Sequence, residues 1–341
     1  MDVYHDNNIW GKGKPETKLT ALPVNHSFLW GEQEILIPAV YVGKAGAALD
    51  VCAKIPIEDM AAFLKKWDYA LRMSLKTPEE FEQIDADNPG SREFAVEICL
   101  DGTPLVRRMS SSLRWYPENI IQMGNANPAS EDGFENNKSA EEWMGTYGCD
   151  KGCCWYFERL SYNWDGEPIL SPQKISLAFR ANLISITAGH FSSDVSCDGK
   201  TVKTAHPITG QEYTLTLHSC EQIRNSFAEI GAKGVVYPEY CQILSYSIAP
   251  EIDRSLFCIR DCAEGDHPRM GDAQGPPGGP DGPTAVFMAG KNAAPDKRMA
   301  ASSLHFEPVS EVQWRMVFQI TPKNDAAISF PIKACSHTNS S

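Results

Sequence analysis

The segment Arg107-Arg108-Met109-Ser110-Ser111-Ser112-Leu113-Arg114-Trp115-Tyr116-Pro117 has a counterpart late in the chain, Lys297-Arg298-Met299-Ala300-Ala301-Ser302-Ser303-Leu304-His305-Phe306-Glu307-Pro308. Each copy is a basic pair, a run of small residues, a leucine and aromatic residues closed by proline, and a one-residue gap aligns the two. A strand ending in cysteine, at Cys52 or Cys220, precedes each copy. We therefore expect an internal duplication, although the likeness of 116–118 to 237–239 gives a competing register.

Length and charge limit the classes of protein to consider. A chain of 341 residues is long for one hydrophobic core, so two domains are expected. The 31 basic and 44 acidic side chains leave a net charge of −13, and no basic run is longer than a pair. Because nucleic-acid binding needs a surface that neutralises phosphates, we do not expect a nucleic-acid partner.

The N-terminal residues have neither the basic nor the apolar region of a secretory signal. No apolar run approaches the roughly 20 residues that a membrane span needs. We expect a cytoplasmic protein without a membrane partner, in which the 11 cysteines are reduced and mostly buried.

Strand patterns outnumber helix patterns and connections are short, which favours antiparallel sheets. Strands are predicted at 28–30, 34–42, 47–52, 93–100, 105–116, 153–162, 175–179, 183–187, 213–218, 242–248, 255–259, 285–288 and 312–320. Helices are predicted from an apolar stripe over 60–71, from a capping box at 77–80 and from a Ser219 cap running to Gly231, with a further capping box at 139–142. We expect 93–100 and 105–116 to form a hairpin, and 122–142 to be a long surface excursion.

These patterns predict an all-β fold with a few peripheral helices, made of two tandem antiparallel β-sandwich or jelly-roll-like units. The expected organisation is an N-terminal arm over 1–20, a first domain over 21–168 and a second over 169–341. A Gly/Pro-rich excursion over 264–284 interrupts the second domain and contains Gly275-Pro276-Pro277-Gly278-Gly279-Pro280, which cannot sit inside a sheet or helix.

Histidine, carboxylate and thiol side chains are the ligand types of divalent metals, and they gather between residues 206 and 221. We consider His206, Glu212 and His218 as candidate ligands of one divalent ion. The alternative is that His218 lies on the solvent face of a half-buried strand. A zinc ion joining the cysteines of 149–154 to Cys258 and Cys262 is a weaker alternative, because a second clean cysteine pair is missing.

The repeated segment supplies the candidate catalytic residues His305, Glu307 and Arg298, and the candidate substrate-binding residues Arg114, Trp115 and Tyr116. A carboxylate and a histidine beside an aromatic platform suit general acid–base chemistry on a carbohydrate or another small polar substrate in an inter-domain cleft. The alternative is an alternating strand in which Leu304 and Phe306 point inward while His305 and Glu307 face water.

Two other functions compete with the enzyme. One is a non-catalytic module that binds a glycan or a protein, and the other is a bicupin-like metalloprotein. The small-molecule substrate is unidentified, and self-association into a homo-oligomer stays open.

Overall fold

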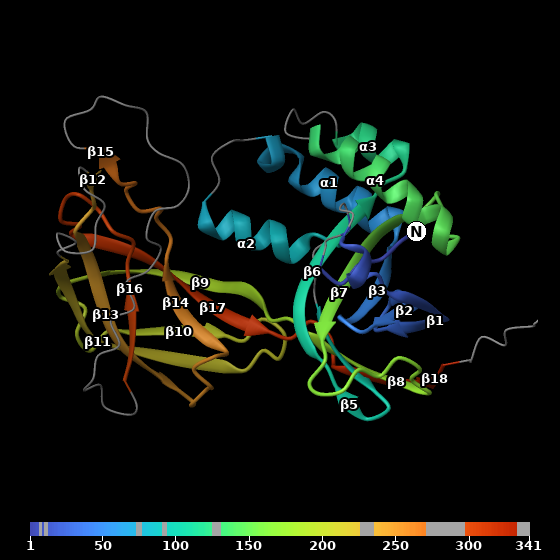
Figure 1. The fold of residues 1–341 in the computed structure, drawn as a ribbon. Helices are drawn as coiled ribbons and strands as arrows, with labels where there is room; N and C mark the ends of the chain where they lie inside the picture. Colours follow the sequence, from blue (N-terminus) through green and yellow to red (C-terminus); the bar gives the residue numbers. More distant parts are fainter. Residues whose placement is uncertain are drawn as a thin grey trace, which may run out of the picture. The chain divides into compact units, whose positions relative to one another are not determined.

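The computed structural model describes residues 1–6, 9, 13–72, 77–90, 94–124, 131–225, 235–270 and 297–332. The described strands pair antiparallel throughout, and helices are few, so the predicted all-β class is confirmed (Figure 1). No helix of the described residues is long and apolar enough to cross a membrane. The strand 285–288 and the Gly/Pro tract lie outside the described residues.

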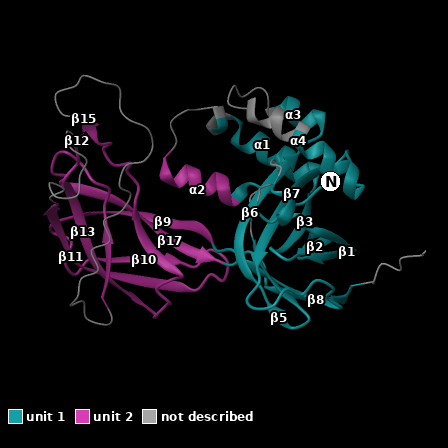
Figure 2. Cartoon of the chain, viewed as in Figure 1, with its two compact units in different colours: residues 1–74, 87–183, 321–341 teal, residues 75–86, 184–320 magenta. Residues whose placement is uncertain are grey.

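The chain divides into two compact units, coloured separately in Figure 2. Unit 1 comprises residues 1–74, 87–183 and 321–341, and unit 2 comprises 75–86 and 184–320. The boundary expected at 168/169 falls inside unit 1, because the strand that follows it pairs with 94–100 in the same sheet. Unit 2 also includes residues 75–86 from the first half of the chain. The alternation of apolar residues that predicts the strands does not indicate that this segment belongs to the second unit.

Unit 1 is a sandwich of two sheets. The first has the order β1-β2-β3-β7-β6, with bounds Thr20–Trp30, Gln33–Gly43, Gly46–Ile55, Cys154–Asn163 and Val106–Trp115. The second has the order β18-β8-β4-β5, with bounds Ala326–Pro331, Lys174–Ala181, Phe94–Leu100 and Thr103–Pro104. Trp30 of the first sheet contacts Phe94 and Phe179 of the second, so large aromatic rings fill the space between the sheets.

The outer face of the five-stranded sheet is covered by α4 (Glu131–Tyr147). Its buried stripe is Ala140, Trp143 and Met144, continued by the partly buried Tyr147, which is the helical spacing of one apolar face. The surface excursion predicted over 122–142 is wrong where the structure describes it, because residues 122–124 belong to a helix and 131–142 to α4, whereas 125–130 lie outside the described residues. The capping box at 139–142 lies within the helix and does not begin it.

The remaining elements of unit 1 are α1 (Ile57–Arg72), α3 (Glu118–Gly124) and the short 3-10 turn η1 (Pro15–Thr17). The stripe over 60–71 correctly predicted α1. The N-terminal residues form more than a polar arm, because Val3 and His5 are buried and Tyr4 bridges to Lys18.

The predicted hairpin of 93–100 with 105–116 is wrong. β4 pairs with β5 over two residues only, and β6 then joins the other sheet beside β7. Leu113 on β6 is buried beneath α4, so the strand contributes an apolar residue to the cluster under this helix.

Unit 2 is a second sandwich. One sheet has the order β10-β11-β13-β16, with bounds Thr201–Ala205, Glu212–Arg224, Tyr240–Ala249 and Arg298–Ala301. The other has the order β14-β17-β9, with bounds Phe257–Asp261, Glu311–Ile320 and Ile184–Asp194. Their facing residues form one core that includes Leu215, Leu244, Trp314, Met316 and Phe318. The small pair β12 (Val235–Val236) and β15 (Arg269–Met270) and the helix α2 (Pro78–Asp87) complete the described elements.

The helix predicted from Ser219 is wrong over 219–224, because β11 continues to Arg224. Ser219 pairs with Ser245 and Arg224 with Tyr240, so the ladder with β13 overrides the local helical spacing. The rest of that predicted helix, residues 226–231, lies outside the described residues. The duplication is not confirmed: segment 107–117 forms most of the long strand β6, whereas only residues 298–301 of its counterpart form a strand.

Candidate metal centre

The helix α2 begins with the capping box that the sequence predicts. The Glu80 amide donates to Thr77 Oγ1 at 3.2 Å, and the Thr77 amide donates to Glu80 Oε2 at 2.8 Å. Two orphan backbone donors are thereby satisfied, and the first turn of the helix is fixed. Glu79 lies in this first turn, and Glu82 follows it about one turn later on the same face.

The outer face of the sheet β14-β17-β9 carries a row of basic side chains. Because Trp314 and Met316 of β17 point into the core, the intervening Arg315 points outward. The register places Arg315 opposite Arg260 of β14 and opposite His190 of β9. Three cationic or ionisable groups thus lie side by side, and such a row requires carboxylates to neutralise it.

Glu82 supplies one of these carboxylates. Arg315 donates to it from both terminal nitrogens, at 2.7 and 2.9 Å, and Arg260 donates at 2.5 Å. Burial raises the pKa of Glu82, but the Arg315 hydrogen bonds and both guanidinium charges outweigh it and leave the pKa below its usual value. Arg315 is only 2% exposed, so the ion pair fixes α2 on this sheet within unit 2.

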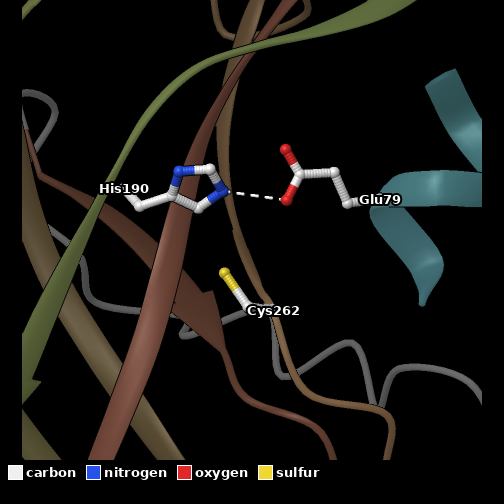
Figure 3. Close-up of side chains that lie close together, drawn as sticks. All are labelled: Glu79, His190 and Cys262. Atoms are coloured by element: carbon white, nitrogen blue, oxygen red, sulfur yellow. Dashed lines mark hydrogen bonds and ion pairs between the residues drawn. The ribbon is translucent and has the colours of Figure 1, made fainter.

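Glu79 lies over the end of the basic row, together with a thiol. Its Oε2 is 2.8 Å from His190 Nε2, and one ligand atom each of Glu79, His190 and Cys262 lies within 4.8 Å of the others (Figure 3). Cys262 directly follows β14, where its amide donates to the Gln313 carbonyl at 2.9 Å. Within the described part of the chain, this is the only group of three such side chains close enough to hold a metal ion.

The chemistry of the three side chains suits a borderline-soft divalent ion. Imidazole nitrogen, thiolate sulfur and carboxylate oxygen are the ligands of zinc, with bonds of about 2.0–2.3 Å. Burial raises the pKa of the Cys262 thiol, and the negative charges of Glu79 and Asp261 raise it further. A cation between the three groups would remove this repulsion and deprotonate the thiol.

The structure does not bring together the ligands predicted from the sequence. His206 Nδ1 accepts the amides of Ile208 and Thr209 at 3.2 Å, which caps a turn. Glu212 and His218 lie on the same strand, β11, at a separation of about 20 Å. His218 Nε2 is 2.9 Å from Ser247 Oγ, as expected for the alternative of a half-buried strand face.

The predicted catalytic residues are also separated. Arg298 is 8% exposed and donates to the backbone carbonyls of Ile252 and Phe257, so it has a structural role in unit 2. Its strand register is with Tyr246, whereas His305 bridges to Tyr240, about 20 Å away along β13.

His305 has instead a carboxylate partner that the sequence analysis missed. Its Nδ1 is 3.8 Å from Asp266 Oδ2, and the same carboxylate accepts the Phe306 amide at 2.8 Å. The Arg269 guanidinium lies 4.1 Å from the centre of the Phe306 ring. Glu307 is exposed and belongs to the same loop.

The predicted substrate-binding residues are in unit 1. Trp115 donates from Nε1 to the Lys151 carbonyl at 3.3 Å, and the Lys151 ammonium lies 5.6 Å from the Trp115 ring. Arg114 lies 5.9 Å from the Tyr156 ring, and burial raises the pKa of Tyr116. The cysteines of 149–154 are likewise in unit 1, and Cys262 is in unit 2.

Sequence reasoning also missed a buried polar network in unit 1. Arg159 donates to Asp50 from Nε at 2.7 Å and from Nη2 at 2.6 Å, and the Tyr147 hydroxyl donates to the same carboxylate. Tyr41 lies 2.6 Å from the Tyr147 oxygen, and the Arg159 guanidinium lies 4.7 Å from the Trp143 ring. Every charge of the network is paired, which is typical of a structural role.

Comparisons of the chain with models of known protein families, with curated proteins and with solved structures found no match.

Proposed function

We propose that this protein binds a divalent metal ion, zinc by ligand type, at Glu79, His190 and Cys262 of unit 2. The observation that carries the proposal is the approach of one imidazole, one thiol and one carboxylate to within 4.8 Å of each other from three separate elements. The direct contact of His190 with Glu79 at 2.8 Å supports it, because a cation replacing the shared proton needs only small side-chain shifts.

Three protein ligands leave one position of a tetrahedral ion open. An ion with an open position lowers the pKa of bound water and polarises carbonyl or phosphoryl oxygens. The His190 side chain is 41% exposed and that of Glu79 30%, so a small polar substrate could reach the ion from solvent. We therefore propose a metal-dependent enzyme that acts on a small polar molecule, in preference to a purely structural metal site.

Metal binding would also reinforce the attachment of α2 to unit 2, because Glu79 is on the helix whereas His190 is on β9 and Cys262 directly follows β14. A ligand that binds only the folded form stabilises it by about 2.7 kcal/mol at a free concentration of about 100 Kd. The melting temperature of unit 2 should consequently rise with zinc.

The test is titration of the chelator-treated protein with zinc against a chromophoric competitor, and with Co²⁺ followed by its thiolate charge-transfer absorption. We expect one equivalent to bind, and the charge-transfer band to vanish in Cys262→Ser. His190→Ala should weaken zinc binding by more than about 100-fold, since even loss of a residue that only supports a ligand costs 10- to 100-fold. His218→Asn serves as the matched control and should bind like the wild type.

The proposal fails if the wild type binds no stoichiometric ion, or if His190→Ala and His218→Asn bind equally. Zinc binding without turnover of any carbonyl or phosphoryl compound would retain the metal site and remove the enzyme.

A second candidate function is general acid–base chemistry on a carbohydrate at His305. The carboxylate of Asp266 beside His305 Nδ1 is the observation that favours it, because such a partner orients an imidazole and stabilises its protonated form. Thermal-shift screening against sugars and sugar acids, followed by turnover assays, tests this candidate. His305→Ala should abolish turnover at an almost unchanged melting temperature, and a large stability loss would show a structural role instead.

The proposal includes a cytoplasmic location, which the free thiols of all the described cysteines favour. A non-catalytic glycan- or protein-binding role corresponds to the outcome in which ligands bind and no compound is turned over.

A further inference from the structure

Two thiols meet beneath the C-terminal end of α4 in unit 1. Cys52 lies on β3, two residues after Asp50 and therefore on the same face of the sheet. α4 ends at Tyr147, and Gly148 adopts a left-handed conformation with φ of 63°, which turns the chain back toward the sheet. The Cys149 amide then donates to the Met144 carbonyl at 3.1 Å, and this bond fixes the position of Cys149.

Both sulfur atoms belong to the same apolar cluster, in which Cys52 is buried and Cys149 is partly buried at its edge. Their side chains are hydrogen-bonded to each other. The bond from the Cys52 thiol lowers the pKa of Cys149, whereas burial, the Cys149 contact and the Asp50 charge raise the pKa of Cys52. The pair therefore consists of a partly exposed sulfur whose pKa is lowered and a buried one whose pKa is raised, so Cys149 is the more easily deprotonated of the two.

A second hydrogen-bonded thiol pair in unit 2 provides a contrast. Cys197 and Cys220 are 0% and 4% exposed, and burial raises the pKa of both. Among the described cysteines whose pKa is shifted, Cys149 is the only one shifted downward; the pKa is raised in Cys52, Cys153, Cys154, Cys197, Cys220, Cys241 and Cys262. Proximity of two thiols therefore does not distinguish the two pairs, whereas the partial exposure of Cys149 and the net lowering of its pKa do.

We propose that Cys52 and Cys149 form an oxidisable dithiol, with Cys149 as the sulfur that reacts with a hydroperoxide and Cys52 as the sulfur that completes a disulfide. The Cys149 thiolate attacks one peroxide oxygen, the O–O bond breaks, and a sulfenic acid forms as hydroxide or alkoxide leaves. The Cys52 sulfur then attacks the Cys149 sulfur, the S–O bond breaks, and water departs with the Cys52 proton. The two thiols together lose two electrons, which reduce the peroxide to water and water or alcohol.

This site is separate from the metal centre of unit 2, so it does not depend on the function proposed above. Its product would join β3 to the end of α4 covalently. Because Asp50 and Tyr147 each lie two residues before one of the cysteines, the cross-link would form close to the buried Asp50 network.

The test uses the full chain, first reduced and then treated with hydrogen peroxide, with intact-mass and peptide mass spectrometry as the readout. We expect a mass loss of about 2 Da, for the two hydrogens removed, and a cross-linked peptide containing Cys52 and Cys149. Iodoacetamide should alkylate Cys149 of the untreated protein at least about tenfold faster than Cys197.

Variants separate the two roles. In Cys52→Ser the sulfenic acid of Cys149 should persist and be trapped by dimedone, whereas the wild type should give little adduct. Cys149→Ser should lose the reaction, and Cys197→Ser, the control, should form the same cross-link as the wild type. Peroxide treatment of the wild type that yields no Cys52–Cys149 peptide, or a cross-link elsewhere, would overturn the proposal without reliance on any variant.

Discussion

Removal of the buried carboxylate at Asp50 tests how unit 1 depends on its internal ion pair. Asp50 is 0% exposed and Arg159 is 4% exposed, and two hydrogen bonds of 2.7 and 2.6 Å join them. In Asp50→Ala the guanidinium stays buried without its counter-ion, and Tyr147 loses its acceptor. Breaking a buried pair in this way costs about 3–5 kcal/mol, far more than the net value of the pair itself.

The matched control is Glu141→Ala. Glu141 lies 3.0 Å from Lys151, but the side chains are 63% and 58% exposed. Exposed pairs contribute about 0–1 kcal/mol, because water screens them and both side chains lose freedom in forming them. The two variants thus remove the same kind of charge from the same unit and differ mainly in burial.

Native-state hydrogen exchange measured by mass spectrometry suits this comparison, because peptides from β3 and β7 report on unit 1 alone. We expect exchange of these amides to be about 100- to 5,000-fold faster in Asp50→Ala, which is the same 3–5 kcal/mol. A double variant, Asp50→Ala with Arg159→Met, removes the orphaned charge and should regain part of the protection. If Asp50→Ala costs no more than Glu141→Ala, the reasoning from burial is refuted.

Two further predictions concern charge and shape. The pKa of Glu82 lies below 4.5 in the folded protein, so its contribution to unit 2 is present above about pH 4.5 and is lost as the pH falls through the folded value. Hydrogen exchange of α2 should show this loss, and Glu82→Gln should show low protection at every pH. Gly46→Ala places a methyl group against the His5 imidazole and should lower the stability of unit 1 by about 1–3 kcal/mol in thermal unfolding. Gly145→Ala, with no neighbour within 4 Å in α4, should instead stabilise by about 0.5–1 kcal/mol, and equal effects of the two would contradict the steric explanation.

The strands could be predicted because their alternation is a local property. Residues 213–218 show it clearly, with Tyr213, Leu215 and Leu217 buried and the residues between them less so. The predictions that failed concern segments whose structure depends on a partner strand. β11 continues past Ser219 because it pairs with β13, and β6 pairs with β7 in the other sheet instead of with β4. α4 was missed because its apolar stripe is diluted by polar residues on the other faces.

The candidate metal centre could not be predicted from local sequence patterns, for a similar reason. The capping box correctly predicted the helix that carries Glu79, but its partners are far away in the sequence, His190 on β9 and Cys262 just after β14. Only the register of three strands shows that Arg260, Arg315 and His190 share one row. Conversely, Glu212 and His218 look close in the sequence, and an extended strand keeps them about 20 Å apart.

The attachment of α2 to unit 2 has a practical consequence for dissecting this protein into parts. A polypeptide restricted to residues 184–320 would contain every strand of the second sandwich, yet it would lack Glu82 and leave the Arg315 guanidinium without its counter-charge. Expression of that half alone should therefore give an unstable product. Supplying residues 75–86 on a fused linker should restore it, whereas a linker that carries Gln in place of Glu82 should not.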